Sequence, residues 1–134
     1  MSKTYAIIGG NSGMGLATVQ RLKSAGHHLH VAARKAESLA DAKVTTQFFD
    51  ATTASSLVWP EKLDGLVYFP GTIQLKPFHR LTAEDFQKDF QTNVLGAVAV
   101  LQSALPALKA SGNASVILFS TVAVAQGMPM HASI

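Results

Sequence analysis

Short apolar runs recur along the chain at intervals that a helix would fill. Residues 5–8, 66–69 and 116–119 are nearly continuous apolar stretches, which is typical of strands buried on both faces of a parallel sheet. Residues 28–33 bring apolar side chains to alternate positions, and residues 44–50 form a β-branched and aromatic run that closes on an aspartate. The pattern therefore predicts five strands.

The intervals between these strands carry helical patterns. Residues 16–25 place leucine and valine side chains along one side and precede Gly26, a residue type that commonly ends helices. Residues 35–42 are expected to form a short helix, and residues 52–60 a weak helical turn. Strands alternating with helices predict the α/β class, with a parallel sheet covered by helices on both faces.

The longest helix is expected over residues 83–110. Thr82, followed by Asp85 three residues later, fits an N-cap with an acidic partner. Apolar side chains cover more of this helix than a single core face requires. We therefore expect another subunit to cover the second surface, which makes the protein a homo-oligomer through residues 83–110.

Composition and charge narrow the function classes. A chain of 134 residues with 48% hydrophobic and 14% charged residues fits one globular domain. The net charge of +3 comes from scattered basic residues without a stripe, which argues against nucleic-acid binding. Cysteine is absent, and the longest uninterrupted apolar run, residues 94–101, is shorter than the ~18 residues of a membrane span. We expect a cytoplasmic protein that binds neither nucleic acid nor membrane.

Glycines crowd into the segment between the first strand and the first helix. Gly9, Gly13 and Gly15 have the spacing G-x-x-x-G-x-G. Where a helix follows a parallel strand, free backbone N–H groups and the helix dipole favour a phosphate if the backbone can approach it. The glycines indicate a diphosphate site, with a plain tight turn as the alternative. Gly13 is expected to be the most sensitive position, because a Cβ there would meet the diphosphate or the start of the helix.

Three segments, in this order, resemble the short-chain dehydrogenase/reductase family: GGNSGMG at residues 9–15, QTNVLGA at 91–97 and VILFST at 116–121. The resemblance covers the whole chain. It implies a Rossmann-type, doubly wound sheet with strand order 3-2-1-4-5, forming one NAD(P)-binding domain over residues 1–134. It also implies hydride transfer between a nicotinamide and a carbonyl or alcohol carbon of a small-molecule substrate.

Positions that match the family's motifs imply roles for individual residues. Those implied to form the phosphate turn are Gly9, Asn11, Ser12, Gly13, Met14 and Gly15. Asp50 matches the acidic residue that meets the adenine ring, and Gly71 stands where the family's N-N-A-G segment contacts the cofactor. Asn93 matches the asparagine of the catalytic tetrad. Thr121, or Ser120 beside it, would hydrogen-bond the substrate oxygen.

Structural roles for the same residues stay open. An asparagine inside an apolar helix, such as Asn93, can bridge backbone groups. Ser120 and Thr121 can simply end a strand, and Asp50 can be a turn residue or the cap of a following helix. Met14 can be packing filler.

The chain departs from the family pattern in ways that affect the expected activity. The segment YFPG at residues 68–71 replaces N-N-A-G, which weakens adenosine-side contacts. The family's catalytic tyrosine is not found: thirteen residues after Thr121 the count reaches Ile134, and the lysine of Y-x-x-x-K would lie beyond it. We therefore expect the chain to be the amino-terminal part of a longer protein and to be inactive alone.

The end of the second strand indicates which cofactor is bound. An acidic residue there suits the ribose 2′-OH of NAD, whereas the 2′-phosphate of NADP needs cations. Here the strand runs into Arg34 and Lys35, and the planar guanidinium of arginine matches a phosphate. NADP is the expected cofactor, with NAD possible. A solvated basic pair is the structural alternative.

Two function classes remain. The first is an NAD(P)-dependent oxidoreductase, and the second is a non-catalytic nucleotide-binding or subunit-interaction module. Metal chemistry is not expected, because His28 and His30 share a strand face without a third convincing ligand.

Overall fold

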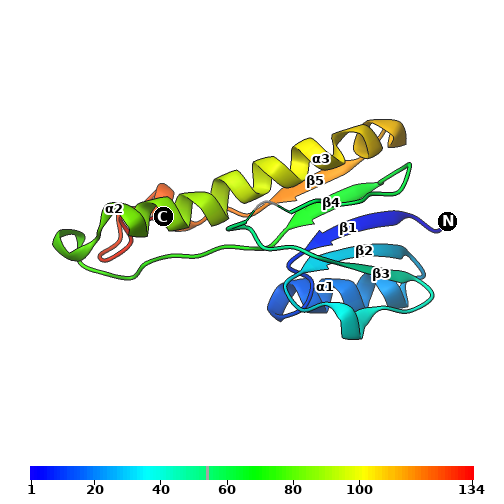
Figure 1. Ribbon diagram of the computed structural model, residues 1–134, viewed down its shortest axis with the longest axis horizontal. Helices are drawn as coiled ribbons and strands as arrows, with labels where there is room; N and C mark the ends of the chain where they lie inside the picture. The colour runs from blue at the N-terminus through cyan, green and yellow to red at the C-terminus, as the bar shows by residue number, and fades with distance from the viewer. Residues whose placement is uncertain (54) are drawn as a thin grey trace.

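A five-stranded parallel sheet lies at the centre of the computed structural model, which describes residues 1–53 and 55–134 (Figure 1). Its strands are β1 (Thr4–Ile8), β2 (His28–Ala33), β3 (Val44–Phe48), β4 (Gly65–Tyr68) and β5 (Ser115–Leu118). The α-helices are α1 (Gly13–Ser24), α2 (Ala83–Phe90) and α3 (Gly96–Ser111). The strand order is β3-β2-β1-β4-β5, so the predicted class and strand order are confirmed.

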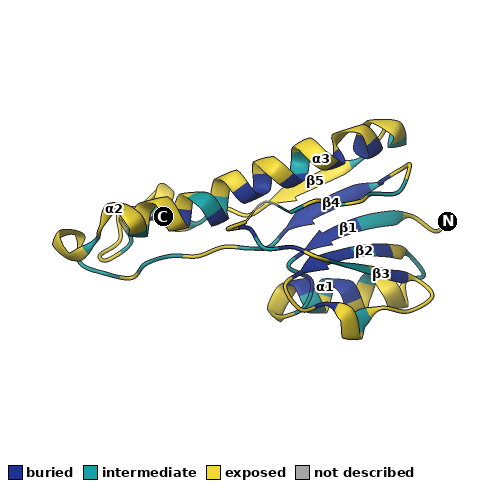
Figure 2. Cartoon of the chain, viewed as in Figure 1, coloured by how far each residue is buried: buried dark blue, intermediate teal, exposed yellow. Residues whose placement is uncertain are grey.

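The core consists of two layers, one on each face of the sheet. In β1, Ala6 and Ile8 belong to the layer that contains Val100 of α3, whereas Ile7 belongs to the layer that contains Val19 of α1. Successive side chains of a strand point to opposite faces, so a strand covered on both faces must be apolar at every position. This is why the central strands are continuous apolar runs, and Figure 2 shows them buried.

Several element boundaries differ from those expected. α1 begins at Gly13 rather than at residue 16, because its first residues are two glycines and the exposed Met14, which add little to an apolar pattern. Residues 35–42 contain only the short 3₁₀ helix Glu37–Leu39. Asp41 draws the chain into a turn there, since its Oδ1 accepts hydrogen bonds from the backbone N–H groups of Lys43 and Val44.

Two further expectations concern the segment around β3. The third strand ends at Phe48, before the predicted end at Asp50, because Asp50 opens a turn. The weak helical turn expected over residues 52–60 falls partly on residue 54, which lies outside the described residues. Residues 52, 53 and 55–60 form no helix.

The long helix is interrupted by a π-helical turn, Gln91–Leu95, between α2 and α3. Its predicted start is confirmed: Thr82 and Asp85 form a reciprocal capping box at the start of α2. Within the π-helical turn, the Thr92 carbonyl accepts a hydrogen bond of 2.6 Å from the Tyr68 hydroxyl. Burial raises the pKa of Tyr68 to about 12, so this donor keeps its proton. The bond ties the turn to the end of β4.

Taken together, residues 83–111 are long and apolar enough to cross a membrane by length and composition alone. The most apolar 18-residue window of this segment has a mean hydropathy of 1.4 and is 33% buried. The longest uninterrupted apolar run did not reveal this segment, because scattered polar residues interrupt the run. The average hydropathy of the segment nevertheless stays high. Val100 and Ala104 pack against the sheet, and a helix that covers a sheet has the same composition. The finding is therefore weak evidence for a membrane span.

β5 forms one edge of the sheet, and its apolar side chains are exposed. Val116, Ile117 and Leu118 are 45%, 52% and 53% exposed, and Figure 2 shows the strand in the colour of exposed residues. On its inner side the strand pairs only with β4 among the described residues. The outer side leaves backbone N–H and C=O groups free to pair with another strand.

His30 of β2 is expected to make the free energy of unfolding depend on pH. Its Nδ1 is buried and has no hydrogen-bond partner among the described residues. Burial, and secondarily the charge of His28, lowers the pKa of His30 below its usual value. The unfolded chain therefore binds a proton at a pH where the folded chain does not, so stability is full above the unfolded pKa and falls as the pH drops towards the folded one.

We expect the free energy of unfolding to decrease between pH 7.5 and pH 5.5 in the wild type, and to decrease less in His30→Gln. Urea denaturation at each pH measures it. The matched control is His79→Gln, which alters an exposed histidine and should keep the wild-type pH dependence. Equal slopes for wild type and His30→Gln would contradict the prediction.

Candidate cofactor-binding site

The glycine-rich turn between β1 and α1 leaves little room for side chains at three positions: Gly9, Gly10 and Gly15. A Cβ on Gly10 would lie 2.8 Å from Val31 Cγ1 and 2.9 Å from Val19 Cγ2. Gly9 has a φ of +79°, and a Cβ there would lie 3.2 Å from Pro70 Cδ and 3.3 Å from Phe69 Cβ. A Cβ on Gly15 would collide with the carbonyl oxygen of Gly9 and lie 2.9 Å from its carbonyl carbon. The turn thus brings the start of α1 into direct backbone contact with the end of β1.

The amino-terminal end of α1 is left without a side-chain cap. Ser12 is its N-cap residue, yet its side chain makes no capping hydrogen bond, and the first turn holds no acidic residue. α2 differs, because Thr82 caps it and Glu84 and Asp85 lie in its first turn. The free N–H groups and the positive end of the dipole of α1 are therefore available to an anion.

A cavity of about 420 Å³ opens beside this helix end. Its walls come from the carboxyl ends of β1 and β2 and from the segments that follow β3 and β4. Open α/β sheets bind ligands in this place, where the strand order reverses. Eight of the nine predicted cofactor-binding residues line it: Gly9, Asn11, Ser12, Met14, Gly15, Arg34, Asp50 and Gly71.

Gly13, the ninth, does not line the cavity. Its φ is +50°, but a Cβ there would meet nothing within 4 Å. A Cβ at Gly13 would therefore meet no neighbouring element, and its expected contact with a diphosphate stays a prediction. Gly13 is the exposed first residue of α1, and the close contact falls two residues later, at Gly15.

Arg34 and Asp50 give the cavity charges of opposite sign. Asp50 Oδ1 accepts hydrogen bonds from Thr52 Oγ1 at 2.7 Å and from Thr52 N at 2.8 Å. These bonds, with a smaller contribution from the positive charge of Arg34, hold the pKa of Asp50 below its usual value, so it is ionised at neutral pH. Asp50 is thus a turn residue, as its structural alternative proposed, and also part of the cavity wall.

Asn93 lies in the π-helical turn and binds the backbone of Thr72. Its Oδ1 accepts from Thr72 N and its Nδ2 donates to Thr72 O, each at 2.8 Å. This is the bridging role that the sequence left open. Asn93 does not line the cavity itself, but it holds Thr72, which does. Its catalytic role stays a prediction.

Ser120 and Thr121 follow β5 and do not line the cavity. Ser120 is exposed, and Thr121 Oγ1 accepts from Ala123 N at 3.3 Å at the start of the 3₁₀ helix Val122–Val124. Both residues follow the carboxyl end of β5, and the cavity opens at the carboxyl ends of the other parallel strands, so they lie at the same end of the sheet as the cavity. Their predicted contact with a substrate is untested.

The cavity also contains residues that sequence reasoning missed. Lys88 of α2 and Thr92 of the π-helical turn line it, together with Thr72 and Pro70 from the segment after β4. Lys88 and Thr92 are four residues apart, which is the spacing of one helix face. This spacing is the only sequence signal that could have indicated Lys88 and Thr92. It is a weak signal, because polar residues four apart are common on helices.

Comparison with known proteins decides the family. The sequence model of the short chain dehydrogenase family matches residues 3–133. The chain belongs to this family. A tropinone reductase homologue from Arabidopsis thaliana is 34% identical over an alignment that covers 89% of this short-chain dehydrogenase chain and 51% of the relative. The chain thus spans about half the length of the curated relatives it matches.

Solved structures share the fold. A short chain dehydrogenase from Shigella flexneri has a TM-score of 0.87 at 19% identity, covering 98% of this chain and 60% of that one. A variant of ElxO with NADPH bound has a TM-score of 0.80 at 19% identity, covering 99% and 61%. The resemblance drawn from the three motifs is confirmed. Short-chain dehydrogenases are oxidoreductases that bind NAD(P), so the non-catalytic alternative is not favoured.

Proposed function

We propose that this short-chain dehydrogenase chain binds NADP(H) in the cavity beside α1. One observation carries the proposal: the uncapped amino-terminal end of α1 meets a cavity lined by eight residues that the sequence predicts as cofactor contacts. Gly9 and Gly15 keep the turn tight, because a Cβ at either position would meet Pro70 or the backbone of Gly9. The uncapped N–H groups that follow this turn suit a diphosphate. NAD is the alternative cofactor for the same cavity.

Each part of the cofactor has a proposed partner. The backbone N–H groups at the start of α1 bind the diphosphate, and Arg34 binds the 2′-phosphate. Asp50 contacts the adenine, and Gly71 lets the chain after β4 approach the cofactor. The bound nicotinamide supplies or accepts a hydride. Residues 1–134 are proposed to act as one NAD(P)-binding domain.

The proposed reaction is the oxidation or reduction of a small alcohol or carbonyl compound. We assign the substrate oxygen to the hydroxyl of Thr121 or Ser120 at the carboxyl end of β5, and a catalytic role to Asn93 in the π-helical turn. Both positions lie at the edge of the sheet where the cofactor cavity opens. The activity of the whole protein rests on this assignment.

We also propose a homo-oligomer that forms through residues 83–110, in the cytoplasm and without nucleic acid or membrane. Large apolar side chains stay exposed along this helix at helical spacing: Phe86, Phe90, Val94, Val98 and Leu105. Such a stripe on a helix that already covers the sheet favours a second apolar surface. A second copy of the chain presents the same stripe.

Calorimetric titration of the 134-residue chain with NADPH and NADH tests the cofactor. We expect Arg34→Ala to weaken NADPH binding by roughly tenfold or more, because it removes a charge-assisted contact to the 2′-phosphate. NADH affinity should stay unchanged. The matched control is Lys35→Ala, because Lys35 adjoins Arg34 but does not line the cavity. Equal NADPH affinity in Arg34→Ala and wild type would contradict NADP as the cofactor.

A further inference from the structure

Asp89 of α2 is a fully buried carboxylate with 0% of its surface exposed. No other charged side chain in residues 1–53 and 55–134 is buried. The ion pairs in that part of the chain join Lys23 to Asp41, Lys62 to Asp64 and Lys76 to Asp85. None of them reaches Asp89. A buried charge without a counterion is costly unless hydrogen-bond donors surround it.

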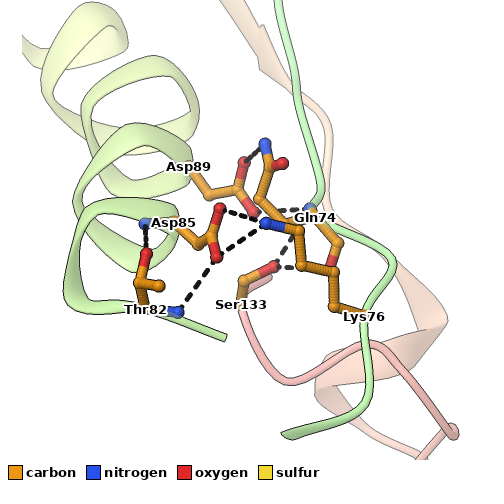
Figure 3. A network of polar contacts seen from close by, with 6 residues as sticks. All are labelled: Gln74, Lys76, Thr82, Asp85, Asp89 and Ser133. Carbon is orange, nitrogen blue, oxygen red and sulfur yellow. Dashed lines mark hydrogen bonds and ion pairs between the residues drawn. The ribbon is translucent and has the colours of Figure 1, made fainter. Parts of the chain in front are cut away.

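The donors to Asp89 come from the segment that follows β4. Its Oδ1 accepts from Thr72 Oγ1 at 2.7 Å and from Gln74 Nε2 at 3.4 Å, and its Oδ2 accepts from Gln74 N at 2.9 Å. Ser133 joins the network, because its Oγ also accepts from Gln74 N, at 3.1 Å (Figure 3). Burial alone would raise the pKa of Asp89, but the polar groups around its carboxylate, on Ser133, Thr72 and Gln74, hold it below its usual value.

This segment has little structure of its own to fix it. Residues 69–77 belong to no helix or strand, so their backbone groups depend on other partners. Thr72 is held from α2 and the π-helical turn at three atoms: Asp89 accepts from its hydroxyl, and Asn93 binds its N and O. Gly71 and Thr72 line the cofactor cavity.

We infer that Asp89 is a positioning residue of the cofactor site, which acts through Thr72 to hold the Gly71–Thr72 wall of the cavity in place. Asp89 does not line the cavity itself. A carboxylate suits this task because it accepts several directional hydrogen bonds at once, whereas an amide offers one acceptor oxygen and would place an NH₂ group against donors. The inference rests on the proposed binding of NADP(H) in this cavity.

Four variants of the 134-residue chain test the inference. Asp89→Asn keeps the shape but removes one acceptor oxygen, and Thr72→Val removes the hydroxyl donor. Thr72→Ser keeps that donor. Asp64→Asn is the matched control: Asp64 also accepts from a backbone N–H, that of Thr4 at 2.9 Å, but it precedes β4 at the end of the sheet away from the cavity. Asp64→Asn should lower the stability of the fold without changing the position of the Gly71–Thr72 wall of the cavity.

Two measurements are made at a temperature where circular dichroism shows each variant folded. Calorimetry should give NADPH dissociation constants at least tenfold higher in Asp89→Asn and in Thr72→Val, lower in Thr72→Ser than in Thr72→Val, and within twofold of wild type in Asp64→Asn. Nuclear magnetic resonance should show tenfold faster hydrogen exchange of the Thr72 amide in Asp89→Asn, without ligand, and wild-type exchange in Asp64→Asn. If Asp89→Asn does not fold, Thr72→Val decides.

A folded Asp89→Asn variant with wild-type NADPH affinity and wild-type Thr72 amide exchange would overturn the inference. So would parallel changes in Asp89→Asn and Asp64→Asn, because they would show a general loss of stability. Failure of the proposed function looks different: the wild type would bind neither NADPH nor NADH. The exchange of the Thr72 amide would then still show whether Asp89 holds this segment, and would limit its role to structure.

Discussion

Alanine at Gly15 is expected to weaken NADPH binding by at least tenfold and to lower the free energy of unfolding by about 1–3 kcal/mol. The new Cβ would collide with the carbonyl oxygen of Gly9 and lie 3.1 Å from the Cα of Gly10. Both contacts are with backbone, which has no side-chain rotation to relieve them. α1 must therefore move away from β1, and the N–H groups at its start would no longer face the cavity in the same way.

Alanine variants at two other glycines are the controls, and they distinguish the effect of this collision from the general cost of replacing a glycine. Gly127→Ala should change neither property, since a Cβ there meets nothing within 4 Å and its φ is not positive. Gly13→Ala meets nothing either, but its φ of +50° strains an alanine by about 1–2 kcal/mol. Urea denaturation and calorimetric titration measure all three. If Gly15→Ala bound NADPH as tightly as wild type, the turn would have no part in holding the diphosphate.

The sequence predicted the sheet well because its central strands are buried on both faces. Such strands must be apolar at every position, and Gly9 after β1 and Pro70 after β4 mark where they end. Local pattern was less informative where exposed residues decide the structure. The start of α1 at Gly13 and the turn at Asp41 depend on hydrogen bonds of the backbone. The spacing of apolar residues does not reveal such bonds.

The candidate site shows the same division. The phosphate turn was predictable because its glycines lie within seven consecutive positions of the chain, residues 9–15, and follow a strand. The hydrogen bonds that hold Thr72 and Gln74 could not be predicted, because their partners are distant in the chain. Asp89 lies 17 residues from Thr72, and Ser133 lies 59 residues from Gln74. A single aspartate on a helix is usually solvated, and only the folded chain reveals the donors that surround it. Asn93 was recognised through its family motif, whereas its bridge to Thr72 needed the structure.

The exposed edge formed by β5 is expected to make the 134-residue chain associate in solution, and Ile117→Lys should reverse this. Natural sheets protect their edges with charged residues or proline, and neither occurs between residues 115 and 126. Ile117 is 52% exposed on a strand whose outer backbone groups lack partners among the described residues. A lysine at the centre of this edge adds a charge that an incoming strand would have to desolvate.

Size-exclusion chromatography with light scattering, over a range of protein concentrations, measures the effect. Wild type should show species well above the 14.2 kDa of one chain, growing with concentration, and Ile117→Lys should lose most of that growth. Thr45→Lys is the matched control, because it adds the same charge to β3, the opposite edge.

Phe90→Lys, on the exposed face of α2, distinguishes the two surfaces. Association through the long helix would respond to Phe90→Lys, and association through the edge would respond to Ile117→Lys. A concentration-independent monomer in the wild type would contradict both, whereas growth that only Phe90→Lys removes would assign the contact to the helix and leave β5 without a role in it.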